Sequence, residues 1–235
     1  MESLVAKVIS RRHARTERAE RDWLARADRT FSENLRFVGA FLRSPGRVGA
    51  LLPSSRVLAR AMIASSDLAA AGAVVELGPG TGSFTRAILE RLGEHTTFFA
   101  LELDWQAVAG LRQNFPELRV YHDSAERIQR YLARHGRPQA DYVISGLPWA
   151  NMGAGVQRRI MGNVAHALAP GGVFTTFTYL ISPLRANGRH YRRVLGELFG
   201  SVEISAVVWR NFPPALVYRC TQVRPPAEAL ALPVG

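Results

Sequence analysis

The sequence predicts an α/β fold: a seven-stranded, mostly parallel sheet with helices on both faces, preceded by an amphipathic helical N-terminal extension. Short apolar runs alternate with amphipathic segments of helical length from residue 74 to residue 220, which is typical of a parallel sheet covered on both faces. The 235 residues, 47% of them hydrophobic, suffice for one such domain with an extension. We assign residues 1–38 to the extension, 39–223 to the domain and 224–235 to a flexible tail.

The expected elements follow in a regular order. After a helix that begins near Ser55, strands are expected at 74–77, 97–101, 119–121, 142–145, 173–177, 202–208 and 216–220. Helices are expected between them, at 84–92, 105–115, 124–134, 156–168 and 189–199. The last two strands, joined by a tight turn at 211–214, can pair antiparallel at the edge of the sheet.

Composition excludes several classes of protein. No apolar run approaches the roughly 18–20 residues of a membrane-spanning helix, and a single cysteine, Cys220, cannot form an internal disulfide. The six histidines lack ligand spacing, so no metal site is expected. The net charge of +11 indicates an anionic partner, either a nucleic acid or a membrane surface. The N-terminus does not resemble a signal peptide, so a cytoplasmic location is expected.

Residues 1–38 form the basic extension, and they have two interpretations. Apolar and basic side chains occupy different sides of the first predicted helix: Leu4, Val5, Val8 and Ile9 against Lys7, Arg11, Arg15 and Arg18. Such a helix either caps the domain with a solvated charged face or lies in a membrane interface. The net charge favours the interfacial helix, which would bind an anionic membrane surface.

The strongest motif is a glycine-rich turn after the first strand, Val-Val-Glu-Leu-Gly-Pro-Gly-Thr-Gly-Ser-Phe at 74–84. Its glycines Gly78, Gly80 and Gly82 allow a tight turn and close approach of a ligand to the backbone. Ser83 occupies the position where a dinucleotide fingerprint needs glycine. Glu76 would repel a pyrophosphate and attract a cationic amine or sulfonium, so nicotinamide binding is disfavoured.

Two further carboxylates follow the next two strands. Glu102 ends the second strand, where a carboxylate accepts hydrogen bonds from ribose hydroxyls in related folds. Asp123 follows the third strand and precedes Ser124. It is either a ligand contact or a helix N-cap, and the two roles are compatible.

These features resemble the class I S-adenosylmethionine-dependent methyltransferases over roughly residues 50–220. The resemblance implies a Rossmann-like fold and S-adenosylmethionine as cofactor, with S-adenosylhomocysteine as product. It implies that Glu76 and the loop Gly78–Gly82, with Thr81, hold the methionine part, that Glu102 binds the ribose, and that Asp123 and Ala125 flank the adenine. The same site is expected to include Leu103, Ser124, Ser145 and Leu147.

The segment after the fourth strand, Ser145-Gly-Leu-Pro-Trp-Ala150, resembles the Asn-Leu-Pro-Tyr motif of rRNA adenine dimethylases. It departs from that motif in Ser145, in an inserted-looking Gly146 and in Trp149. Together with the loop at 49–55 and the segment at 211–215, it most resembles the bacterial phospholipid N-methyltransferases. The resemblance implies methylation of phosphatidylethanolamine to phosphatidylcholine, and the alternative is an RNA adenine-type N-methyltransferase.

The residues expected around the lipid headgroup follow from this hypothesis. Trp149 and Tyr179 are expected to face the cationic nitrogen, although Tyr179 can equally be a packing residue. His190 and Glu33 are candidate proton acceptors. The arginines near residue 190 bind the lipid phosphate or form a solvated face. The expected protein is peripheral on the inner face of the cell membrane, with no nucleic-acid partner, and its oligomeric state is not predicted.

Overall fold

A computed structural model describes residues 55–224 of the chain. The extension at 1–38, the candidate Glu33 and the loop at 49–54 lie outside the described residues, as does the tail from residue 225. The expectations for these segments therefore remain predictions. The described part begins at Ser55, whose side chain caps helix α3 (Arg56–Met62) by accepting from the backbone N–H of Leu58.

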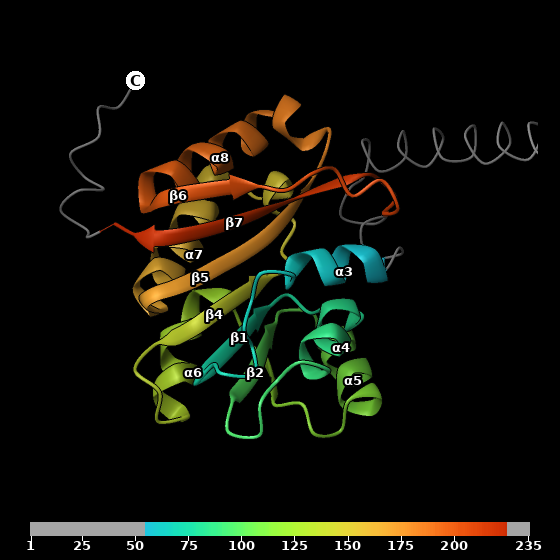
Figure 1. Ribbon diagram of the computed structural model, residues 1–235, viewed down its shortest axis with the longest axis vertical. Helices are drawn as coiled ribbons and strands as arrows, with labels where there is room; N and C mark the ends of the chain where they lie inside the picture. The colour runs from blue at the N-terminus through green and yellow to red at the C-terminus, as the bar shows by residue number, and fades with distance from the viewer. Residues whose placement is uncertain (1–54, 225–235) are drawn as a thin grey trace, which may run out of the picture. The chain divides into compact units, whose positions relative to one another are not determined.

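One seven-stranded sheet organises the described residues, in the order β3-β2-β1-β4-β5-β7-β6 (Figure 1). Its strands are β1 (Ala73–Leu77), β2 (Thr97–Glu102), β3 (Val120–His122), β4 (Ala140–Ser145), β5 (Leu168–Tyr179), β6 (Phe199–Ile204) and β7 (Ala215–Val223). β1 to β5 pair in parallel, and β7 runs antiparallel to both of its neighbours. The predicted fold class is confirmed. The strand order reverses between β1 and β4, and open α/β sheets bind ligands at such a switch point.

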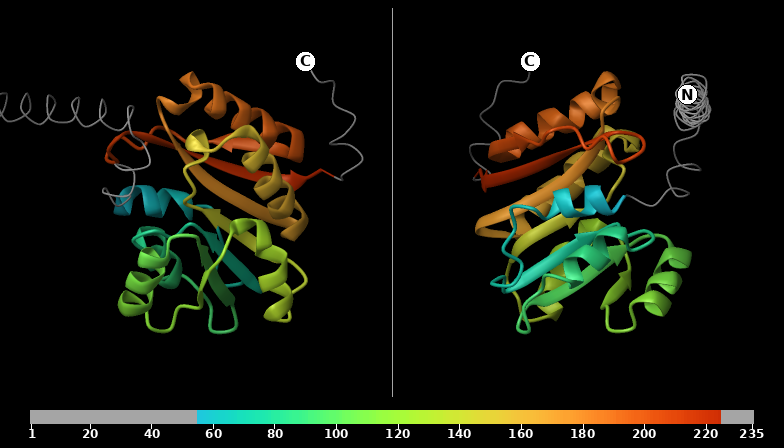
Figure 2. Two further views of the ribbon diagram at one scale, coloured as in Figure 1. Left: turned by 180° about the vertical axis from the view of Figure 1, so that it is seen from behind. Right: turned by 45° about the vertical axis from the view of Figure 1, so that its right-hand side comes forward.

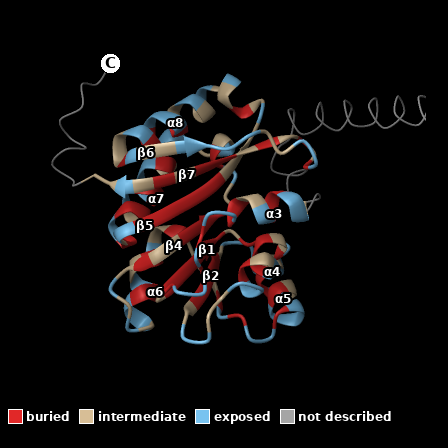
Figure 3. Cartoon of the chain, viewed as in Figure 1, coloured by how far each residue is buried: buried red, intermediate tan, exposed pale blue. Residues whose placement is uncertain are grey.

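Helices cover both faces of the sheet (Figures 1 and 2). One face packs against α3, α4 (Ser83–Leu89) and α5 (Trp105–Asn114), and the other against α6 (Ile128–Arg134), α7 (Ala154–Ala167) and α8 (Ala186–Leu198). Alternate residues of one strand enter opposite cores: Val74 packs on the α3–α5 side and Val75 on the α6–α8 side. Figure 3 shows the resulting buried sheet between half-exposed helices.

Strand β6 ends at Ile204, so the predicted strand at 202–208 is wrong in its second half. Ser205 closes the ladder: its side-chain oxygen accepts from the backbone N–H of Val217 at 3.0 Å. The chain then leaves the sheet, and only Val208 returns to it, in a single bridge to Ala215. The connection between β6 and β7 is therefore a long loop, 205–214, rather than a tight turn.

Neither a membrane-spanning helix nor a metal cluster is found between residues 55 and 224. No helix there is long and apolar enough to cross a bilayer. No three His, Cys, Asp or Glu side chains of this part of the chain are grouped so that they could hold a metal ion.

Candidate active site

The glycine loop lies directly after β1, and its three glycines all have positive φ angles, 68° at Gly78, 53° at Gly80 and 83° at Gly82. L-residues rarely adopt this conformation. A Cβ at Gly82 would lie 2.4 Å from the ring of Phe115, and one at Gly78 would lie 2.7 Å from Leu147, whereas one at Gly80 would meet nothing within 4 Å. The loop is thus packed at both ends and open in its middle, which suits backbone contact with a ligand.

Glu76 is fully buried beneath this loop. Its Oε2 accepts a hydrogen bond from the Thr85 hydroxyl at 2.7 Å, and its Oε1 is enclosed without a partner among the described residues. Burial raises the pKa of Glu76 to about 8, opposed by the Thr85 hydrogen bond and reinforced by the charge of Glu102. The Oε1 atom of Glu76 is therefore available to accept a hydrogen bond, and a bound cationic donor would favour the ionised form of the carboxyl.

Glu102 joins the end of β2 to the glycine loop. Its Oε2 accepts the backbone N–H of Gly80 at 3.0 Å, and its Oε1 accepts those of Leu103 and Asp104 at 2.7 and 2.9 Å. The side chain of Leu103 is 71% exposed. The carboxylate of Glu102 and the exposed apolar side chain of Leu103 are thus adjacent. A ribose would require the first as a hydrogen-bond acceptor, and an adenine ring would require the second as an apolar contact.

Asp123 occupies the end of β3, but it is not the helix cap. The cap is Ser124, whose hydroxyl accepts from the backbone N–H of Glu126 and begins the 3-10 helix η1 (Ala125–Arg127). Asp123 accepts from the Ser124 backbone N–H and the Tyr131 hydroxyl, and pairs with Arg127 at 3.3 Å. Partial burial works to raise the pKa of Asp123, and these contacts outweigh it, so the carboxyl stays ionised. The neighbouring Ala125 is buried.

The loop after β4 lies against the glycine loop. Gly146 donates its backbone N–H to the Leu77 carbonyl at 2.8 Å, and a Cβ on Gly146 would lie 2.5 Å from the Gly78 carbonyl oxygen. Ser145 is buried, and its hydroxyl accepts from the backbone N–H of Leu147. The glycine that departs from the dimethylase motif therefore has a steric reason, which the sequence alone did not reveal.

Trp149 is buried, which argues against the predicted contact with the cationic nitrogen. Its side chain is 2% exposed, its indole N–H donates to the Thr176 hydroxyl at 3.0 Å, and its ring stacks on Tyr191 at 4.5 Å. The Thr176 hydroxyl in turn donates to the Ser145 carbonyl. This placement favours a packing role that holds the loop after β4.

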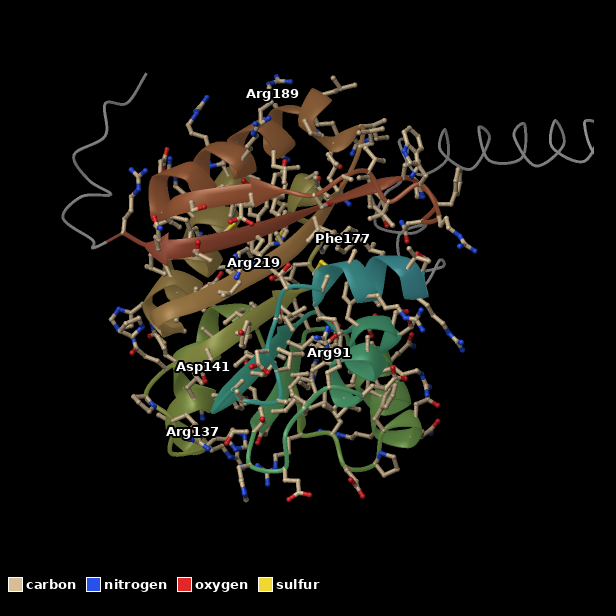
Figure 4. The ribbon with its side chains drawn as sticks, viewed as in Figure 1. Arg91, Arg137, Asp141, Phe177, Arg189 and Arg219 are labelled. Carbon is tan, nitrogen blue, oxygen red and sulfur yellow. The ribbon has the colours of Figure 1, made fainter. Side chains whose placement is uncertain are left out.

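Tyr179 is partly buried against the core on the other face of the sheet from Trp149, so the two rings do not form one cage. The Tyr179 ring packs edge-on against Phe177 at 5.5 Å, and Phe177 packs against Phe84 at the start of α4. Phe177 is labelled in Figure 4. Burial raises the pKa of the Tyr179 phenol. This row of aromatic rings leads from the glycine loop toward the end of β5.

Two residues on the α6–α8 side complete the description. His190 lies in α8, and its Nε2 is enclosed without a partner in the described part of the chain. Gln157, which sequence reasoning missed, is fully buried and donates from Nε2 to the carbonyls of Trp149 and Asn187. It ties the loop after β4 to α8, and its only signal in the sequence is a polar residue within an apolar helical stripe.

Known proteins are similar to this chain in sequence and in fold. The chain is 32% identical over 191 residues, 80% of its length and 95% of the relative's, to the ornithine lipid N-methyltransferase of Singulisphaera acidiphila. It is 31% identical over 99 residues, 42% of its length, to a quarter (25%) of a mitochondrial ribosomal RNA small subunit methyltransferase of Arabidopsis thaliana.

The fold is also that of a solved enzyme, the O-methyltransferase TomG of Streptomyces achromogenes in complex with S-adenosylmethionine. The TM-score is 0.56 at 15% identity, over 72% of this chain and 82% of that one. Residues 75–174 match the methyltransferase domain family. With the strand order, the glycine loop and its two carboxylates, these matches establish that the chain belongs to the class I methyltransferases and uses S-adenosylmethionine as its cofactor.

Proposed function

We propose that the protein transfers methyl groups from S-adenosylmethionine to the amine of a lipid headgroup, and that phosphatidylethanolamine and its mono- and dimethyl derivatives are its substrates. The observation that carries the lipid assignment is the 32% identity that extends over 95% of a lipid N-methyltransferase. The choice of phosphatidylethanolamine rests on the resemblance of the segments at 49–55, 145–148 and 211–215 to phospholipid N-methyltransferases.

The residues around the glycine loop fit the cofactor. The enclosed Oε1 of Glu76 would accept from the ammonium of the methionine part, and the open backbone at Gly80 allows close approach. Glu102 would exchange part of its contact with Gly80 for the ribose hydroxyls, and Leu103 would cover the adenine. When bound, the cofactor supplies a methyl group already activated by the positive charge of its sulfonium.

The protein's task is then to prepare and place the amine. A primary ammonium has a pKa of about 10.4 in water, so the headgroup must lose a proton before its nitrogen can attack. The raised pKa keeps the Tyr179 phenol neutral. Its oxygen would accept a hydrogen bond from the amine and orient it without taking up the proton. We retain His190 and Glu33 as candidate proton acceptors.

The test is incubation of the full chain with methyl-labelled cofactor and three acceptors: vesicles containing phosphatidylethanolamine, vesicles containing ornithine lipid, and ribosomal RNA. We expect label in mono-, di- and trimethylated phospholipid, and none in vesicles of pure phosphatidylcholine, whose nitrogen is already quaternary. Label in ornithine lipid alone would support lipid N-methylation and refute phosphatidylethanolamine as the substrate. Label in RNA alone would refute both and favour the RNA methyltransferase.

A further inference from the structure

Three segments far apart in the sequence meet at one end of the sheet. The Ser55 backbone N–H, at the start of α3, donates to the Asn211 side chain at 2.9 Å. The Leu180 backbone N–H, just after β5, donates to the Pro214 carbonyl at 2.9 Å. The start of α3, the loop after β5 and the loop 205–214 are thus joined by hydrogen bonds, and they lie at the same end of the sheet (Figures 1 and 2).

Large apolar side chains are exposed on these segments. Leu184 is 78% exposed and Trp209 is 69% exposed, and Val57 and Leu180 add smaller exposed areas of 39% and 38%. The four side chains come from three segments that hydrogen bonds join, and large apolar exposure gathered on adjoining segments is typical of an interaction site.

The segments that carry these side chains are basic. Segments 55–66, 177–196 and 204–223 contain no Asp or Glu. Their exposed arginines are Arg56, Arg60, Arg189, Arg192, Arg193 and Arg210. Arg189 donates to the Leu184 carbonyl at 2.7 Å, which places a guanidinium beside the most exposed leucine, on the outer side of α8 (Figure 4). We call the four apolar residues and these six arginines the basic apolar edge.

We propose that the basic apolar edge is itself a docking surface for an anionic phospholipid bilayer. Leucine and tryptophan side chains enter a membrane interface while guanidinium groups bind lipid phosphates in its headgroup layer. Protruding leucines are not needed for binding an RNA backbone, for which arginines alone suffice. The proposal rests on the proposed function and adds the orientation in which the domain meets its substrate.

This docking would bring the headgroup to the candidate site. Tyr179 is the last residue of β5 and directly precedes Leu180 of the edge. A lipid whose phosphate pairs with the edge arginines would then place its amine at the ends of β4 and β5 while its acyl chains remain in the bilayer.

A single labelled thiol tests the orientation. Cys220, the only cysteine, is buried, so an environment-sensitive fluorophore can be attached selectively to a full-length L184C variant. We expect a blue shift on addition of vesicles of phosphatidylglycerol and phosphatidylcholine, and quenching by brominated lipid. The matched control is L89C: Leu89 is 37% exposed at the end of α4, and its label should not respond. Vesicle binding without a response at position 184, or no binding to anionic vesicles, would overturn the proposal.

A double variant separates this proposal from the proposed function. L184D/W209D should weaken binding to anionic vesicles at least tenfold, with S-adenosylhomocysteine affinity unchanged by calorimetry, whereas L89D should bind vesicles normally. In L184D/W209D, the ratio of methyl transfer on vesicular lipid to transfer on short-chain monomeric phosphatidylethanolamine should fall at least tenfold. An unchanged ratio refutes the docking surface alone. Absence of transfer to any lipid by the unmodified protein refutes the proposed function instead, and selective loss of RNA binding in the variant refutes the membrane as partner.

Discussion

Thr85 donates its hydroxyl hydrogen to one oxygen of the buried Glu76 carboxyl at 2.7 Å, and the other oxygen is enclosed without a partner among the described residues. The carboxyl is therefore half-satisfied in the protein alone. Since burial raises its pKa to about 8, it is mostly protonated at neutral pH. A cationic ligand reverses that preference, which links cofactor binding to proton release.

We predict that cofactor binding releases about one proton per site at pH 7. The ammonium of the cofactor favours ionised Glu76, so affinity should rise by up to tenfold per pH unit from about pH 6 to pH 8 and then level off. Titration calorimetry of S-adenosylhomocysteine in phosphate and in Tris measures the proton count through the difference in buffer ionisation enthalpy. In Glu76→Gln the proton release and the pH dependence should disappear and the affinity should fall. Equal enthalpies in both buffers for the unmodified protein would contradict the assignment.

Glu76→Gln should also stabilise the protein without cofactor. Below about pH 4.5 the carboxyl is protonated in the folded and unfolded chains alike, so it contributes no difference. From pH 4.5 to 8 only the unfolded chain ionises, which destabilises the fold by about 1.4 kcal/mol per pH unit, roughly 5 kcal/mol in total. A buried amide N–H without a partner offsets about 1–3 kcal/mol of the gain.

Urea unfolding at pH 5 and pH 8 checks this, and the advantage of the variant should be larger at pH 8. A variant that is less stable than the unmodified protein at pH 8 would mean that Glu76 is ionised there.

The placement of Glu76, Glu102 and Asp123 could be predicted. Short apolar runs mark three parallel strands, and the three carboxylates stand at or next to the carboxyl ends of these strands, which share one edge of the sheet. The state of Glu76 could not be predicted, since its pKa depends on enclosure by several elements. The same holds for Trp149. Its partners Thr176 and Tyr191 lie 27 and 42 residues further along the chain, and nothing local marks the indole as a core residue.

Glu102→Ala should weaken cofactor binding by about 10–100-fold, because the carboxylate supplies charge-assisted hydrogen bonds, each contributing about 1.5–3 kcal/mol. Asp104→Ala is the matched control, two residues away. Asp104 caps α5 by accepting from the backbone N–H groups of Gln106 and Ala107, so its loss should cost about 1 kcal/mol of stability and leave affinity unchanged. Calorimetry and thermal unfolding of both variants separate the roles. Equal affinity of Glu102→Ala and the unmodified protein would remove Glu102 from the site.

Gly146→Ala should lower stability by about 1–3 kcal/mol, because the added Cβ would lie 2.5 Å from the Gly78 carbonyl oxygen and push the two loops apart. Cofactor affinity should fall with it. Gly110→Ala, in the interior of α5 with nothing within 4 Å of its Cβ position, should be neutral or stabilising by about 0.5–1 kcal/mol. Similar stability losses in both variants would show that close contact of the loops is not what Gly146 provides.

Tyr179→Phe should reduce turnover by about 5–10-fold, the value of one hydrogen bond near 1 kcal/mol, and leave S-adenosylhomocysteine affinity unchanged. Phenylalanine keeps the edge-on contact with Phe177 and removes only the hydroxyl. Because the phenol is neutral and its pKa is raised, the effect should not vary between pH 7 and pH 9. Tyr142→Phe is the control: its hydroxyl accepts from the Asp67 backbone N–H, so its loss should lower stability but not turnover. Single-turnover transfer of labelled methyl measures the rate of each variant. Equal rates in the Tyr179 variant and the unmodified protein would make Tyr179 a packing residue.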